Sequence, residues 1–148
     1  MVQSIQEYQP MDRGKIDNLI CYLLAIANYA KDIHYNCGGE SFYGQHLFAD
    51  RFTDNLQDYI DQLKEICLLG HGFKPLHSNE YLRRGADLIP EAVDFRLMHD
   101  LMLNCLQEIE GVEDISKGDE NLIGAIAQDL QNNVGLLNIM EGEPLKNV

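Results

Sequence analysis

Apolar residues recur every three or four positions over long stretches of the chain, which is the period of one face of an α-helix. The first stretch begins near Ile16 and ends near Asn36, where Gly38 and Gly39 interrupt the pattern. The second runs to Gly70, and Ser41 is its expected N-cap. We predict one long helix over each stretch.

Two further helices follow a longer link, which runs from His71 to Pro90 and has room for one short helix near residues 80–84. Pro90 is expected to open the third long helix, whose stripe extends from Val93 to Ile109. The fourth carries its stripe from Leu122 to Leu137. The pattern predicts an all-α fold, a four-helix bundle with a short extra helix between helices 2 and 3.

Length and composition support one folded unit. With 148 residues and 45% hydrophobic residues, residues 1–148 are expected to form a single domain with flexible ends at 1–11 and 142–148. No apolar stretch reaches membrane length and the first residues do not read as a signal peptide, so we expect a cytoplasmic protein. Cys21 and Cys105 fall on apolar helix faces and should be core, whereas Cys37, beside the turn, remains open.

The net charge restricts the partners. The chain carries 24 acidic and 11 basic residues, a formal charge of −13, which disfavours nucleic acid and anionic membranes and favours cations. The link histidines His71 and His77 are expected to be exposed, and His99 to lie on a helix flank.

Histidines and carboxylates at metal-binding spacing surround the first turn. His34 ends the first helix, and His46 and Asp50 are four residues apart on the second, as are Asp61 and Glu65. Residues at this spacing reach the same point beside a helix. A row of acids alone is more often a solvated flank, but two histidines bracketing a tight turn beside carboxylates favour a metal site.

Helix geometry divides these residues into two half-sites. Asp50 and Asp61 share a face of the second helix, since eleven residues are about three turns, and they lie about 16 Å apart along the axis. One ion cannot span that distance. A two-fold axis that pairs the second helix with its twin would join each half to the complementary half of the other subunit.

The same residues resemble the signature of the Dps-type mini-ferritins, which are ferritin-like proteins. That signature reads H-x11-H-x3-D-x10-D-x3-E, and His34, His46, Asp50, Asp61 and Glu65 fill all five positions. The resemblance implies a ferroxidase centre shared between subunits, which oxidises Fe(II) to Fe(III) with hydrogen peroxide or oxygen and protects against oxidative stress. It also implies iron storage in a homo-oligomeric shell of twelve subunits built from two-fold dimers.

The resemblance further implies roles for single residues. Asp61 and Glu65 would bind the first iron with His34 of the partner subunit, and His46 and Asp50 would hold a weaker second position. An acidic turn between the last two helices would line an iron entry path, and its carboxylates are Glu113, Asp114, Asp119 and Glu120. The same four residues could equally form a solvated loop in which acids favour a helix start.

The chain departs from the family at two places. Tyr35 follows the first histidine where the family often has Trp, and no Lys-rich terminal arm is present, which makes DNA binding unexpected. The sequence also has no ExxH, so the site within one bundle that larger ferritins use is not expected. A DNA-compacting shell protein and a structural bundle without metal chemistry remain as alternatives.

Overall fold

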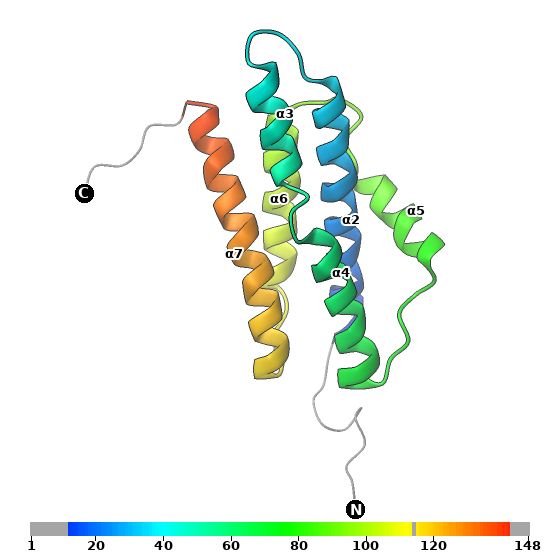
Figure 1. Cartoon of the computed structure of the whole chain (residues 1–148). Helices are drawn as coiled ribbons and strands as arrows, with labels where there is room; N and C mark the ends of the chain where they lie inside the picture. Colours follow the sequence, from blue (N-terminus) through cyan, green and yellow to red (C-terminus); the bar gives the residue numbers. More distant parts are fainter. Residues whose placement is uncertain (1–11, 114, 143–148) are drawn as a thin grey trace, which may run out of the picture.

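The protein is described here by a computed structural model that covers residues 12–113 and 115–142; the ends expected to be flexible lie outside these residues, except for Gly142. Within them every regular element is helical, which confirms the predicted all-α class (Figure 1). The elements are α2 (Arg13–Asn36), α3 (Phe42–Arg51), α4 (Leu56–Glu65), the π-helix η1 (Ile66–Gly70), α5 (Ser78–Leu88), α6 (Phe95–Glu110) and α7 (Lys117–Met140). No helix among the described residues is long and apolar enough to cross a membrane.

The first helix begins and ends where the sequence predicts. The Asp12 side chain accepts a hydrogen bond from the backbone N–H of Lys15 at 3.3 Å, which satisfies one of the unpaired donors of a helix start. At the other end Gly39 has a φ of +88°, a conformation that favours glycine. Ser41 occupies the N-cap position of α3, but its side chain makes no capping hydrogen bond.

The predicted second helix is present but bent, and its two main parts are α3 and α4. Residues 52–55 form turns between α3 and α4, and Figure 1 shows α4 continuing below α3 after a bend. Asn55 has a φ of +65° and is the single non-glycine residue with positive φ in the described chain. Asn tolerates this left-handed conformation better than most residues. The regular helical period is interrupted between Asp50 and Asp61, so helix geometry alone does not determine whether the two side chains share a face.

The third long helix starts later than predicted. It begins at Phe95, not at Pro90, because the Asp94 side chain caps it by accepting from the backbone N–H of Arg96 at 2.9 Å. Val93 precedes this cap and is 44% exposed, so it does not belong to the buried stripe. The Tyr29 hydroxyl donates to the Ala92 carbonyl at 2.6 Å and ties this extended segment to α2.

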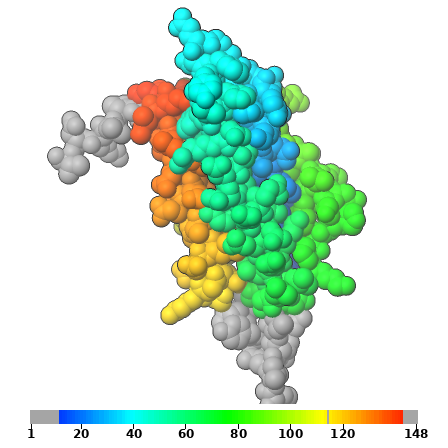
Figure 2. All heavy atoms as spheres, in the orientation of Figure 1, coloured from blue at the N-terminus to red at the C-terminus, as the bar shows by residue number. Residues whose placement is uncertain are grey.

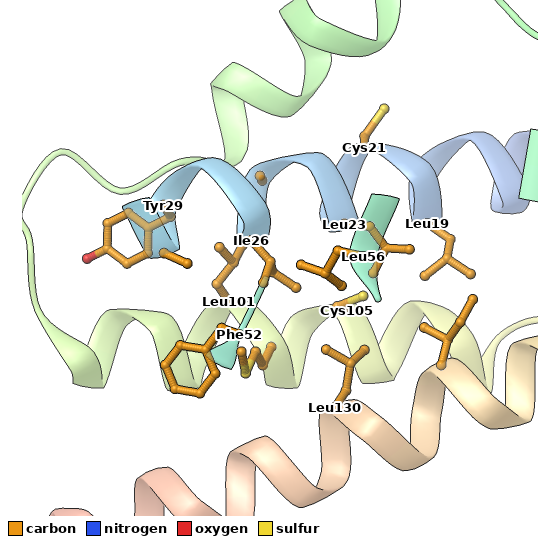
Figure 3. Packing of buried hydrophobic residues seen from close by; sticks show 14 of the residues in the cluster. Leu19, Cys21, Leu23, Ile26, Tyr29, Phe52, Leu56, Leu101, Cys105 and Leu130 are labelled. Carbon is orange, nitrogen blue, oxygen red and sulfur yellow. The ribbon is translucent and has the colours of Figure 1, made fainter. Parts of the chain in front are cut away.

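The core is a single cluster of apolar side chains between α2, α6, α7 and the bent α3–α4 pair. Figure 3 shows Leu23 and Ile26 of α2 facing Leu101 and Cys105 of α6. Cys21 and Cys105 are both buried, as predicted. The short helix predicted in the link is present as the longer α5, which packs on α2 so closely that a Cβ at Gly85 would lie 3.3 Å from a backbone oxygen of α2.

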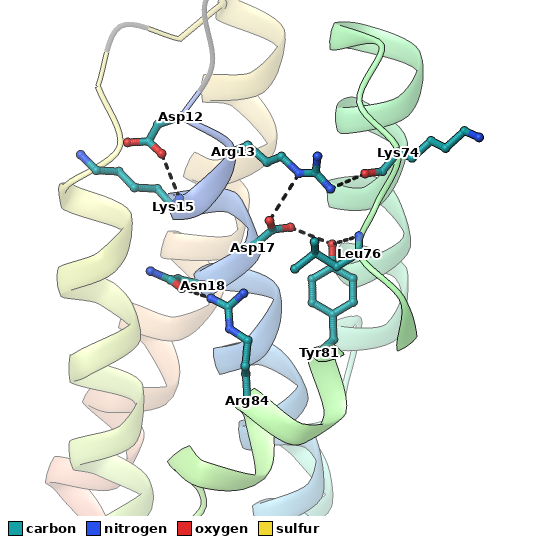
Figure 4. A network of polar contacts seen from close by, with 9 residues as sticks. All are labelled: Asp12, Arg13, Lys15, Asp17, Asn18, Lys74, Leu76, Tyr81 and Arg84. Carbon is teal, nitrogen blue, oxygen red and sulfur yellow. Dashed lines mark hydrogen bonds and ion pairs between the residues drawn. The ribbon is translucent and has the colours of Figure 1, made fainter. Parts of the chain in front are cut away.

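A polar network fastens the link to the start of α2 (Figure 4). The Tyr81 hydroxyl donates to the buried Asp17 carboxylate at 2.7 Å and accepts from the backbone N–H of Leu76 at 3.0 Å. Arg13 pairs with the second oxygen of Asp17 at 3.5 Å. Burial and the Asp17 carboxylate raise the pKa of Tyr81, so its hydroxyl stays protonated and able to donate.

Candidate metal centre

Two histidines close the corner between α2 and α3. His34 lies in the last turn of α2 and His46 lies in α3. The Nδ1 of His34 is 2.8 Å from the backbone oxygen of His46, and the Nδ1 of His46 is 2.8 Å from the backbone oxygen of His34. The two rings stack with centroids 3.4 Å apart and planes 24° from parallel. The structure thus brings these two predicted ligands together.

This reciprocal arrangement indicates which nitrogen of each ring carries a proton. A backbone carbonyl can accept a hydrogen bond but cannot donate one, so each Nδ1 must carry the proton. In a neutral imidazole the other nitrogen, Nε2, then holds a lone pair. A ring that donates one N–H to a carbonyl and offers the opposite nitrogen to a metal is the usual arrangement of metal-binding histidines. Neutral rings also stack without the repulsion that two imidazolium ions would have.

Asp50 is paired with a lysine that sequence reasoning did not single out. The Lys31 ammonium donates to the Asp50 carboxylate at 2.6 Å, and both side chains are about half exposed, at 45% and 48%. The hydrogen bond from Lys31 lowers the pKa of Asp50, and the same bond raises the pKa of Lys31. Asp50 is thus a carboxylate whose oxygen already has a cationic partner.

Asp61 and Glu65 lie on the exposed side of α4, beyond the break. The buried residues of α4 are Leu56, Ile60 and Leu63, so the two carboxylates project away from the core. Among residues 12–113 and 115–142, no three His, Cys, Asp or Glu side chains gather closely enough to hold an ion. Within these residues the histidine corner and the α4 carboxylates do not form one cluster.

The acidic residues of the turn before α7 differ in how exposed they are to solvent. Glu113 and Glu120 are exposed, and Asp114 lies outside the described residues. Asp119 is 6% exposed, and its carboxylate is 2.6 Å from Nε2 of His71. A carboxylate buried against a histidine is not displayed toward solvent by this protomer, which separates Asp119 from Glu113 and Glu120.

The other histidines and Cys37 differ in burial and in their contacts. The prediction that His71 is an exposed link residue is wrong, because it is 2% exposed and pairs with Asp119. His77 is exposed as predicted, and its Nδ1 accepts from the backbone N–H of Asn79 at 3.2 Å, capping α5. His99 is partly buried on α6, with Nδ1 3.2 Å from the neighbouring Asp100 carboxylate. Cys37 is partly buried, and its thiol is 3.6 Å from the His34 carbonyl.

A second polar contact joins α4 to α7. The Tyr59 hydroxyl donates a short hydrogen bond to Asp129. Burial and this carboxylate raise the pKa of Tyr59 to about 12, so the hydroxyl keeps its proton at neutral pH. Neither this bond nor the His71–Asp119 pair has a local sequence signal, because each joins residues at least 48 positions apart.

Comparison with solved structures identifies the fold. The Dps protein from Vibrio cholerae O1, described as a member of a broad superfamily of ferritin-like diiron-carboxylate proteins, aligns with a TM-score of 0.61 at 21% identity, covering 86% of this chain and 87% of that one. A Dps structure from Mycobacterium smegmatis aligns with a TM-score of 0.65 at 16% identity, covering 95% and 98%. No family model and no curated protein sequence matches the chain. At these identities the comparison shows that the chain has the ferritin-like fold of Dps proteins.

Proposed function

We propose that this protein is a Dps-type mini-ferritin, an iron-storage protein that oxidises Fe(II) with hydrogen peroxide or oxygen at sites shared between two subunits. In this proposal the protein assembles through two-fold dimers into a hollow dodecamer, acts in the cytoplasm and protects the cell against oxidative stress. Iron is its substrate and its cargo.

The histidine corner is the observation that carries the proposal. The two rings are held by their Nδ1 atoms on backbone carbonyls at 2.8 Å, an arrangement that leaves two Nε2 lone pairs for a borderline metal such as Fe(II). The pair also occupies the first two positions of the five-residue spacing that resembles the Dps signature.

The α4 carboxylates complete the donor set when two subunits meet. Asp61 and Glu65 are exposed on one side of the protomer, where a second copy can reach them, and carboxylate oxygens stabilise Fe(III) after oxidation. In the proposed site they hold the first iron with His34 of the partner subunit. Two Fe(II) ions that each release one electron reduce the O–O bond of one hydrogen peroxide, which takes up two protons and gives two water molecules, so no hydroxyl radical is formed.

The second iron position is weaker in this chain. His46 and Asp50 would form it, but Lys31 neutralises Asp50 at 2.6 Å. A cation that binds there competes with the ammonium group, which already contacts one of the two carboxylate oxygens. We therefore propose that the first position loads before the second and governs the onset of oxidation.

Mixed assemblies test the shared site directly. One variant carries His34→Ala and His46→Ala, and the other carries Asp61→Ala and Glu65→Ala, so that each is defective in every site it forms with itself. Both should lose rapid Fe(II) oxidation while keeping the parent's mass in solution, because the residues are partly or fully exposed. In dimers that contain one subunit of each variant, one of the two sites should be intact, and Fe(II) oxidation should partly recover.

The control is a mixture in which both subunits carry the Asp61→Ala and Glu65→Ala changes under different affinity tags. It should form mixed dimers equally well and remain inactive. Verified mixed dimers of the two different variants that show no recovery would contradict the shared centre, and a parent that does not oxidise Fe(II) would contradict the function itself.

A further inference from the structure

The helix that carries Asp61 and Glu65 is held on the bundle separately from the helix before it. Residues 52–55 interrupt the regular backbone hydrogen bonding between α3 and α4, so the orientation of α4 does not follow from that of α3. Figure 2 shows α3 and α4 running along one face of the molecule, with α7 on one side of α4. The contacts that fix α4 must therefore come from its neighbours across the bundle.

Two polar bonds to α7 flank the carboxylates along the chain. On the N-terminal side, the Tyr59 hydroxyl donates to Asp129. On the C-terminal side, His71 directly follows η1, the continuation of α4, and meets Asp119 at 2.6 Å with 3% and 9% of the two side chains exposed. We call these two bonds the α7 clasps.

Asp119, the α7 residue of the second clasp, is itself held in place by a hydrogen bond. The backbone N–H of Asp119 donates to the Ser116 hydroxyl at 3.1 Å, the N-cap bond of α7. Asp119 and Asp129 are ten residues apart on one helix, about 15 Å along its axis. Two attachment points at that separation restrain both the tilt and the rotation of the attached segment.

Rotation of α4 about its own axis is what the clasps control most directly. At 100° per residue, Asp61 lies about 160° and Glu65 about 120° around the helix from Tyr59. On the other flank, Lys64 lies 5.1 Å above the Tyr81 ring, about 140° from Tyr59. The buried face lies between these two flanks, and the carboxylates lie opposite it.

Even a small rotation of this helix moves its side-chain ends further than metal–ligand distances tolerate. A side chain reaches about 5–6 Å from the helix axis, so a rotation of 10° moves its end by about 1 Å. Metal–ligand distances tolerate about 0.2 Å. Packing of the apolar face restrains this rotation, and the polar bonds add contacts that depend on direction as well as distance.

We propose that Tyr59 and Asp119 are positioning residues of the iron centre, which set the rotation of α4 through the α7 clasps and so aim Asp61 and Glu65 at the metal. This inference rests on the proposed function. It gives Asp119 a role distinct from lining an entry path, since its carboxylate is committed to His71.

The test measures Co(II) binding to the chelator-treated oligomer, followed by the visible absorption of bound Co(II), at a temperature well below unfolding. Tyr59→Phe keeps the ring and removes one clasp, and Asp119→Ala removes the other. Each should weaken Co(II) binding several-fold, and the double variant about tenfold or more, a loss typical of residues that orient metal ligands. The absorption spectrum of bound Co(II) should change as well, because the ligand geometry changes.

A matched control exists on the other flank of α4. Tyr81→Phe removes another tyrosine–aspartate bond, the one to Asp17 at 2.7 Å, but keeps the ring that faces Lys64. It should lower the unfolding temperature at least as much as Tyr59→Phe while retaining the parent's Co(II) affinity and spectrum. Asp129→Asn keeps an acceptor oxygen for the Tyr59 hydroxyl and should bind Co(II) as the parent does.

Parent-like binding by Tyr59→Phe, or an equal loss in Tyr81→Phe, would overturn the positioning role. The milder Tyr59→Phe decides the question even if Asp119→Ala unfolds the chain. Failure of the underlying function gives a different result, namely a parent that binds no Co(II), or one whose binding is unaffected by Asp61→Ala and Glu65→Ala.

Discussion

Replacing Lys31 with Met should strengthen metal binding at the weaker of the two proposed positions. In the parent the ammonium lies 2.6 Å from the Asp50 carboxylate, with both side chains about half exposed. Met keeps most of the aliphatic chain and removes the charge. Asp50 would then offer a free carboxylate beside His46.

The size of the effect follows from two contributions. Displacing the ammonium from an exposed pair costs about 0.2–1 kcal/mol. Once displaced, it remains tethered to α2, and at a distance of about 8 Å in water-like surroundings it repels a divalent cation by about 1 kcal/mol. Together these predict about tenfold tighter binding in Lys31→Met, since about 1.4 kcal/mol corresponds to a factor of ten.

The assay is anaerobic calorimetric titration with Fe(II), in which the weaker binding step is compared between variants. Lys31→Arg keeps a cation beside Asp50 and should resemble the parent. Lys74→Met removes one positive charge from an exposed site elsewhere and controls for net charge. Equal affinity of the weaker step in parent and Lys31→Met would refute this reasoning.

The pH dependence of the same pair gives a second check. Asp50 has a lowered pKa, so the pair's contribution is present above the ordinary value of 3.8 and is lost as the pH falls through the lowered pKa. Lys31 has a raised pKa, so the contribution is present below 10.5 and is lost as the pH rises through the raised value. The difference between parent and Lys31→Met in the stability of the folded protein should therefore be constant from about pH 5 to pH 9.

Three further outcomes are expected. With a net charge of −13 per chain, the metal-free protein should not retard duplex DNA in a gel-shift test at low salt, and retardation would favour a DNA-compacting role. Changing Glu113 and Glu120 to Gln should slow iron uptake at low salt, with a smaller effect at high salt because screening acts within about 10 Å; equal uptake would place the entry path elsewhere. Leu23→Ala, at a fully buried position, should lower the free energy of unfolding by about 3 kcal/mol in a denaturant titration, and a loss below 1 kcal/mol would contradict its place in the core.

The sequence predicted the bundle well because apolar periodicity reports local burial. The first helix ends beside Gly39 as expected, and Cys105 is in the core. The same reasoning failed at Phe52–Asn55, since the apolar period continues through the break while the backbone does not. The Asp54–Asn55 pair was the available signal, because Asn favours the left-handed conformation seen there.

The sequence predicted which residues belong to the candidate site, but it did not predict all the contacts that they make. Spacing placed His34 and His46 at one corner, and the structure confirms that they meet. Lys31 lies one helical turn before His34, on the same side of α2, and could have been noticed on that basis. The burial of His71 could not have been predicted from the sequence. Its partner Asp119 is 48 residues away, and tertiary packing alone brings them together.

The crossed ring–carbonyl bonds of His34 and His46 bear on the speed of metal capture. An imidazole that rotates freely in the metal-free protein must lose that freedom when it binds, at a cost of about 0.5–1.5 kcal/mol for an ordered side chain. Here each ring is already held at 2.8 Å by the other's backbone and stacked at 3.4 Å. In the proposed iron centre an arriving ion would therefore meet imidazoles that need little rearrangement, and a search among histidine rotamers should not limit loading at this corner.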